Sequence, residues 1–210
     1  MASTDYANDS AKTYSEIVAD RSTSRLSKYF FSDGRSGYAK RNAVQECQAT
    51  AWEEGLSFLI QKSKDKDCYL DERLLKEIKE AIAQIKIIKE AVAFIASETR
   101  DAEQMHSLLV RTETTVFTQF IILDKCIEAG WAEPLDLLIE RTKRTYSTLE
   151  NMPKEYTYYS VYKKANAGLK TIAQRRRAMD EKGKVAEVIK QNPALANLPG
   201  KAQQAQKNGN

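Results

Sequence analysis

Apolar residues recur along much of this chain with the spacing of amphipathic helices. The longest run extends from Asp71 to Thr99, where apolar positions return at alternating steps of four and three residues. These positions are Leu74, Ile78, Ala81, Ile85, Ile88, Val92 and Ile95. A heptad pattern held over three periods predicts a helix. Leu75, Ile82 and Phe94 widen the apolar stripe beyond the seam of a two-stranded coiled coil, so we expect this helix to lie inside a bundle.

Helical patterns also cover most of the remaining chain. We expect helices over residues 13–32, 38–64, 101–129, 133–152 and 156–182, with a further short helix at 184–191. Gly34 and Gly37 mark a turn between the first two. The joint at Thr99–Asp101 contains neither glycine nor proline. It is either a kink or, as we favour, a reversal that lets both apolar stripes find a partner. No internal repeat of fixed period is recognisable.

These elements predict an all-α fold, an antiparallel bundle of about five or six helices with flexible N-terminal and C-terminal tails. We expect a flexible segment at 1–11, the bundle at 12–152, a basic helical segment packed on it at 153–191, and an irregular tail at 192–210. The composition agrees with this organisation. The chain has 210 residues, 42% of them hydrophobic, with 8 Gly and 4 Pro, too few turn residues for a typical all-β fold. No window approaches the roughly 18 apolar residues of a membrane-spanning helix, so we expect no membrane partner.

The charge is distributed unevenly along the chain. Residues 1–140 contain 18 Lys and Arg against 24 Asp and Glu, a net charge of −6. Residues 141–210 contain 15 against 5, a net charge of +10. Such an asymmetry indicates that the C-terminal third meets a polyanion or an acidic partner. The alternatives are a solubilising tail, or a basic end that docks on the acidic part of a neighbouring copy.

Most catalytic and metal-binding classes lack their residues here. His106 is the single histidine, and it completes only one Glu-x-x-His motif, with Glu103, so a di-iron bundle is excluded. Cys47, Cys68 and Cys126 form no Cys-x-x-Cys pair, and we expect them to be small buried hydrophobic residues. Phosphate-binding glycine motifs are absent. We therefore expect no enzyme activity, no metal and no cofactor. The polar start of the chain and the unpaired cysteines favour a cytoplasmic, reducing location.

A basic and aromatic cluster in the C-terminal third is the candidate functional site. Its expected nucleic-acid-binding residues are Arg141, Lys143, Arg144, Lys154, Tyr158, Tyr162, Lys163, Lys164, Lys170, Arg175, Arg176 and Arg177. Cations bind phosphates and tyrosine rings stack on unpaired bases, so RNA or single-stranded DNA is the expected ligand. Lys163, Lys170 and Arg177 are spaced seven apart and would share one helix face.

Two functions fit this pattern. In the first, a helical protein binds nucleic acid without sequence specificity through its basic third while self-associating, as in a nucleoprotein or coat. In the second, the basic end mediates protein–protein assembly in a structural or adaptor protein, because Tyr and Arg are also enriched at protein interfaces.

Overall fold

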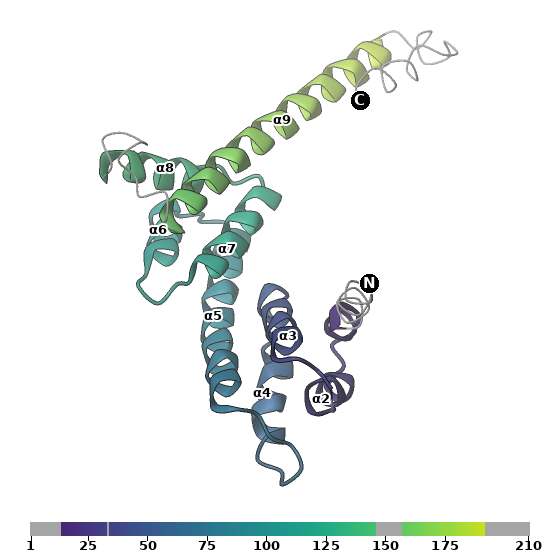
Figure 1. Cartoon of the computed structure of the whole chain (residues 1–210). Helices are drawn as coiled ribbons and strands as arrows, with labels where there is room; N and C mark the ends of the chain where they lie inside the picture. Colours follow the sequence, from purple (N-terminus) through teal and green to yellow (C-terminus); the bar gives the residue numbers. More distant parts are fainter. Residues whose placement is uncertain (1–13, 33, 146–156, 192–210) are drawn as a thin grey trace, which may run out of the picture.

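The computed structural model describes residues 14–32, 34–145 and 157–191, and these contain helices and no strand (Figure 1). The all-α prediction is confirmed. Residues 14–19 are helical. The helices that follow are α2 (Thr23–Phe31), α3 (Gly37–Ala49), α4 (Glu53–Lys62), α5 (Glu72–Ala96), α6 (Ala102–Val110), α7 (Val116–Glu128), α8 (Glu133–Thr145) and α9 (Thr157–Gln191). The expected tails at 1–11 and 192–210 lie outside the described residues.

Three of the expected helices are each divided into two. The first divides before Ser22, whose hydroxyl accepts the N–H of Arg25 and starts α2. The second divides at Ala51, where φ is 52° and α3 cannot continue. The third divides at Thr115, whose hydroxyl accepts the N–H of Thr118 and starts α7. Capping by short hydroxyl side chains competes with helix continuation, and it leaves the apolar periodicity nearly unchanged.

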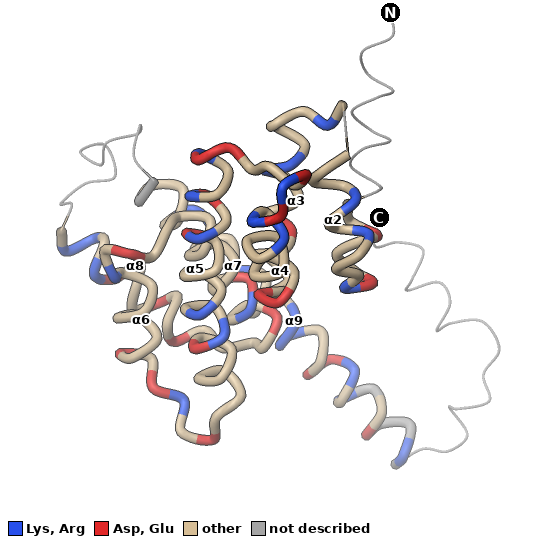
Figure 2. The backbone as a smooth tube through the Cα atoms, turned by 90° about the horizontal axis from the view of Figure 1, so that it is seen from below, with Lys and Arg blue, Asp and Glu red and all other residues tan. Residues whose placement is uncertain are grey.

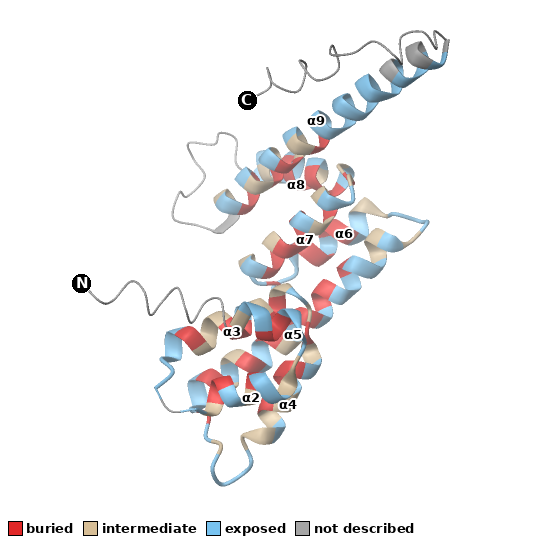
Figure 3. Cartoon of the chain, turned by 90° about the vertical axis from the view of Figure 1, so that its right-hand side faces the viewer, coloured by how far each residue is buried: buried red, intermediate tan, exposed pale blue. Residues whose placement is uncertain are grey.

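Helix α5 connects two hydrophobic cores (Figure 3). Its first half, through Ile85, packs with residues 14–19, α2, α3 and α4. Its second half, from Ile87 on, packs with α6, α7, α8 and α9. We call the first group, residues 14–85, the first unit, and the second group, residues 86–172, the second unit. The chain therefore forms two helical clusters along one shared helix, an arrangement more elongated than a single bundle.

The two units repeat the same plan. Helices α2 and α3 begin at positions 23 and 37, and α6 and α7 begin at positions 102 and 116, so both pairs are related by the same shift along the sequence. The helix pairs in contact also correspond: α2–α4 with α6–α8, α3–α5 with α7–α9, α4–α5 with α8–α9, and α3–α4 with α7–α8. Most buried residues of α2, α3 and α4 have a buried counterpart along this register. The matches include Leu26 with Met105, Val44 with Leu123, Cys47 with Cys126, Trp52 with Trp131, Leu56 with Leu135 and Leu59 with Leu138.

The ends of α3 and α7 show the repeat in detail. The N–H of Trp52 donates to the carbonyl of Cys47, and the N–H of Trp131 donates to the carbonyl of Cys126. Both bonds belong to the same helix-terminating turn, in which Ala51 and Gly130 have positive φ. Each tryptophan is then buried at the start of the next helix.

The structure thus shows a repeat of helices that the search for a fixed period in the sequence did not reveal. The shift that relates the two units is constant through α8, but it lengthens in the last helix pair, where Ile172 of α9 takes the place of Ile85 of α5. A shift that changes along the chain, with few identical residues, leaves no fixed period in the sequence.

Helix α9 has a packed half and a projecting half. The packed half, through Ile172, lies against α7 and α8 and buries Val161, Tyr162 and Ala165. From Ala173 to Lys190, the side chains that the structure describes are all exposed. This projecting half extends away from the body of the molecule (Figures 1 and 3).

Candidate nucleic-acid interface

The outward face of α9 carries a row of cations. Lys163, Lys170, Arg177 and Lys184 are exposed and follow one another every seven residues on one continuous helix. At 1.5 Å per residue, this basic stripe is roughly 31 Å long, with about 10 Å between successive cations. In the part of the chain that the structure describes, these four side chains are in no ion pair. The stripe contains three residues that the sequence predicts and adds Lys184.

The two tyrosines of α9 whose side chains the structure describes, Tyr159 and Tyr162, make contacts within the molecule. Tyr162 is 7% exposed and belongs to the second core. Tyr159 is half-buried, and the ammonium of Lys163 lies 4.5 Å from its ring centroid. From Lys163 to Asn210 the sequence contains no aromatic residue. The stripe therefore presents charge without aromatic rings along most of its length.

The side chain of Arg141 is bound by two residues of α6. Its guanidinium pairs with Glu103 and donates to Nδ1 of His106 at 3.2 Å, so it connects α8 to α6. A guanidinium can only donate, so Nδ1 of His106 carries no proton. Burial, followed by the charge of Arg141, lowers the pKa of His106. Both side chains of the Glu-x-x-His motif, Glu103 and His106, therefore bind Arg141.

Two other predicted cations, Arg144 and Lys164, are also bound within the molecule, and among the described residues Lys143 has no such partner. Arg144 pairs with Glu140 on its own helix. Lys164 pairs with Asp124 at 2.7 Å and lies over the ring of Phe120. Lys143 is exposed on the last turn of α8.

Arg175 and Arg176 bind the end of α7 rather than facing solvent freely. Arg175 donates to the carbonyl of Ile127, and Arg176 donates to the carbonyl of Gly130, each at 3.1 Å. Helix ends carry unpaired carbonyls and negative partial charge, which cations stabilise. These two arginines therefore fix α9 where its projecting half begins.

The predicted residues do not all form one surface. The basic end of α8, with Lys143 and Arg144, lies on the opposite side of the molecule from the projecting half of α9 (Figures 1 and 2). Lys154 and the side chain of Tyr158 lie outside the described residues.

Part of the charge asymmetry is satisfied inside the molecule. Residues 97–140 contain three Lys and Arg against nine Asp and Glu, so most of the acidic excess lies in this segment. It forms α6, α7 and the start of α8, and the packed half of α9 lies on α7 and α8. The projecting half of α9 carries charges of both signs, with cations in excess (Figure 2).

The repeat explains why this half of α9 is uncovered. In α5, the corresponding half presents Ile87, Phe94 and Ile95 to the second unit, and Ile88 is also buried there. When Ile172 is aligned with Ile85, α9 has Gln174, Arg175, Glu181 and Lys182 at these positions. Polar residues at the end of a repeat array prevent another unit from packing there. The projecting half is thus suited to solvent and to charged partners.

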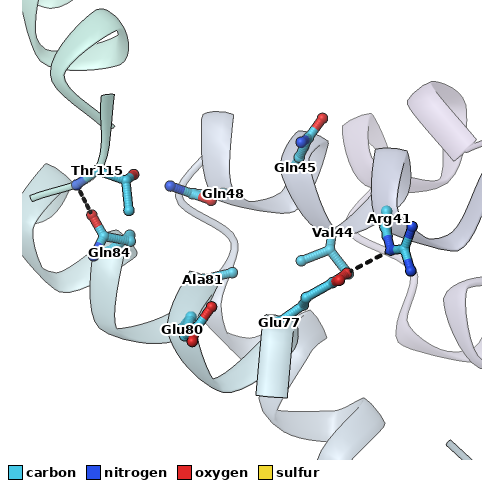
Figure 4. A pocket seen from close by; sticks show the side chains of 9 residues that line it. All are labelled: Arg41, Val44, Gln45, Gln48, Glu77, Glu80, Ala81, Gln84 and Thr115. Atoms are coloured by element: carbon cyan, nitrogen blue, oxygen red, sulfur yellow. Dashed lines mark hydrogen bonds and ion pairs between the residues drawn. The ribbon is translucent and has the colours of Figure 1, made fainter. Parts of the chain in front are cut away.

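A buried polar network at the junction of the two units escaped the sequence analysis. Gln84 on α5 accepts from the hydroxyl of Thr118 at 2.7 Å and from the N–H of Thr115 at 3.0 Å. Gln48 on α3 donates to the same Thr118 hydroxyl at 2.9 Å. A pocket of about 250 Å³ between α3 and α5 opens beside this network, with the Arg41–Glu77 ion pair at its other end (Figure 4). The signal in the sequence was a glutamine on the apolar face of the helix with the heptad pattern, α5.

The remaining chemical groups fit structural roles. Cys47 and Cys126 are fully buried, and burial raises the pKa of each thiol to about 12, so both stay protonated. Cys68 is half-buried in the loop before α5. Among the described residues, no three His, Cys, Asp or Glu side chains are grouped as metal ligands would be. None of the helices within the described ranges has the length and apolar character needed to cross a bilayer.

Comparison with known proteins adds no assignment, since no family model, curated protein or solved structure matches this chain.

Proposed function

We propose that this protein binds nucleic acid without sequence specificity through the basic stripe of α9. The observation that carries the proposal is the row Lys163, Lys170, Arg177 and Lys184, exposed at a constant spacing on one helix. Arg141, Arg144, Lys164, Arg175 and Arg176 contact partners within the molecule, so the stripe is the longest row of exposed cations offered to a polyanion by the described residues. Binding of this kind depends on phosphate charge and carries no base readout.

The body of the molecule acts as a support in this proposal. The packed half of α9 is held by the second core, and Arg175 and Arg176 anchor the next turn to α7. The projecting half thereby extends from the body as a rigid helix whose described side chains are exposed.

The alternative of protein assembly has less support at this surface. If a second copy continued the repeat, it would pack where α5 receives the second unit, and α9 has polar residues at those positions. Self-association through another surface stays a prediction from the sequence.

The test is binding of a fluorescently labelled mixed-sequence oligonucleotide, followed by anisotropy at several salt concentrations. Four phosphate contacts give a slope of log K against log salt of about −3.6 on duplex DNA, or a loss of about 150-fold between 50 and 200 mM salt. A variant with Lys163, Lys170, Arg177 and Lys184 all replaced by Gln should lose most of the binding.

A matched control separates the stripe from net charge. Replacing Lys64, Lys66, Lys79 and Lys86 by Gln removes the same charge from exposed positions in the first unit and the start of the second. This control variant should bind nearly as tightly as the natural protein. Equal losses in the two variants, or no binding by the natural protein, would refute the proposal.

A further inference from the structure

We infer that the basic stripe prefers double-stranded nucleic acid to single strands of the same length, an inference that rests on the proposed function. In the described part of α9, each aromatic side chain is either buried or covered by a cation. Proteins that bind single strands gain about 1–3 kcal/mol for each base stacked on an aromatic side chain. Tyr162 is buried, Tyr159 lies under Lys163, and no aromatic residue follows in the chain.

Charge density is the second argument. Along the roughly 31 Å of the stripe, a duplex presents about 18 phosphates, at one charge per 1.7 Å, and a single strand at 3.4 Å presents about half that number. With charge as the main source of affinity, the denser polyanion releases more counterions for each cation bound. The stripe therefore gains more from a duplex.

Rigidity is the third argument. The four cations lie on one uninterrupted helix whose packed half is fixed by the second core and whose projecting half is fixed at its base by Arg175 and Arg176. A stripe of this length is close to one turn of duplex, about 34 Å. A duplex is stiff over this distance, whereas a flexible strand loses conformational entropy when it is straightened along a rod.

This ligand differs from the single strand that the sequence pattern favoured. That expectation depended on tyrosines interleaved with cations, and the fold places the described tyrosines of α9 against the body of the molecule. The cations alone follow the outer face of the helix.

The experiment compares a 20-base-pair mixed-sequence DNA duplex, an RNA duplex of the same sequence and a dT20 single strand, each competing for the full-length protein at constant salt. Both duplexes should bind at least about fivefold more tightly than dT20, and the fourfold Gln variant of the stripe should lose binding to all three. The salt slopes should be about −3.6 for the DNA duplex and about −2.8 for dT20.

The outcomes separate the two proposals. Equal or tighter binding of dT20 would overturn the duplex preference and leave the nucleic-acid function standing. Absence of binding to all three would overturn both. Vesicles made of phosphatidylserine form a further arm, and binding to them in the absence of binding to nucleic acid would also overturn both.

Discussion

Gly168 lies where α9 packs against α7 and α8, and the structure predicts that its replacement by alanine destabilises the protein. A Cβ added at this position would lie 2.5 Å from Cδ1 of Ile127 and 2.8 Å from Cδ2 of Leu135. Overpacking of a core by one carbon costs typically about 1–3 kcal/mol. Alanine in place of glycine inside a helix returns about 0.5–1 kcal/mol. The Gly168→Ala variant should therefore be less stable than the natural protein by up to about 2.5 kcal/mol.

The same helix supplies the control. Gly183 lies in the projecting half, and a Cβ added there has no atom within 4 Å. The Gly183→Ala variant gains helix propensity without a clash, so it should be as stable as the natural protein or slightly more stable. Urea unfolding followed by far-ultraviolet circular dichroism measures both. A Gly168→Ala variant as stable as Gly183→Ala would show that α9 does not lie this close to α7 and α8.

Two further predictions concern the buried polar groups. Replacing Thr118 by Val removes the hydroxyl that donates to Gln84, and urea unfolding should show a loss of about 1–3 kcal/mol in the free energy of unfolding. The control Thr171→Val, on α9, should change this free energy by less than about 0.5 kcal/mol. Similar losses in the two variants would contradict the network. The pKa of His106 is lowered in the folded state, so the unfolded chain takes up this proton first and stability should fall as pH drops below about 6.5, by at most about 1.4 kcal/mol per pH unit. His106→Asn keeps an acceptor for Arg141, and unfolding measured at pH 7.5 and 5.5 should lose this dependence; a slope that persists in the variant would place its origin elsewhere.

The fold class and helix α5 followed from periodicity, because apolar spacing indicates which residues are buried. Helix ends followed less well. Ala51 adopts positive φ at the end of α3 without being glycine, and Thr115 starts α7 inside an unbroken apolar pattern. These ends depend on hydrogen bonds of single residues, which hydrophobic spacing does not register.

The arrangement of the cations could also be predicted only in part, because it depends on helix ends and on contacts between helices. The seven-residue spacing of Lys163, Lys170 and Arg177 predicted that they share one helix face, and in the structure all three are exposed on the single helix α9. Lys184 was missed because an ending near Lys182 was expected, whereas α9 continues through Gly183 to Gln191. Composition could not reveal that Arg141 would bind Glu103 and His106, because that contact depends on how α6 meets α8 in space.

The repeat left one usable trace in the sequence. Cys47 and Trp52 recur as Cys126 and Trp131 with identical separation, and in both places a helix ends and another begins. Two such residue types at equal spacing are a weak signal alone. They become informative once matched burial shows that both pairs occupy equivalent positions.

The shared helix α5 means that neither half of the protein is self-sufficient. A fragment that ends with α5 would leave Ile87 and Ala91 facing water. A fragment that begins with α6 would lack the surface of α5 against which α6 and α7 pack. Damage on one side should consequently be transmitted to the other, so that a lesion in either half causes the whole polypeptide to melt, and to be degraded, in a single step.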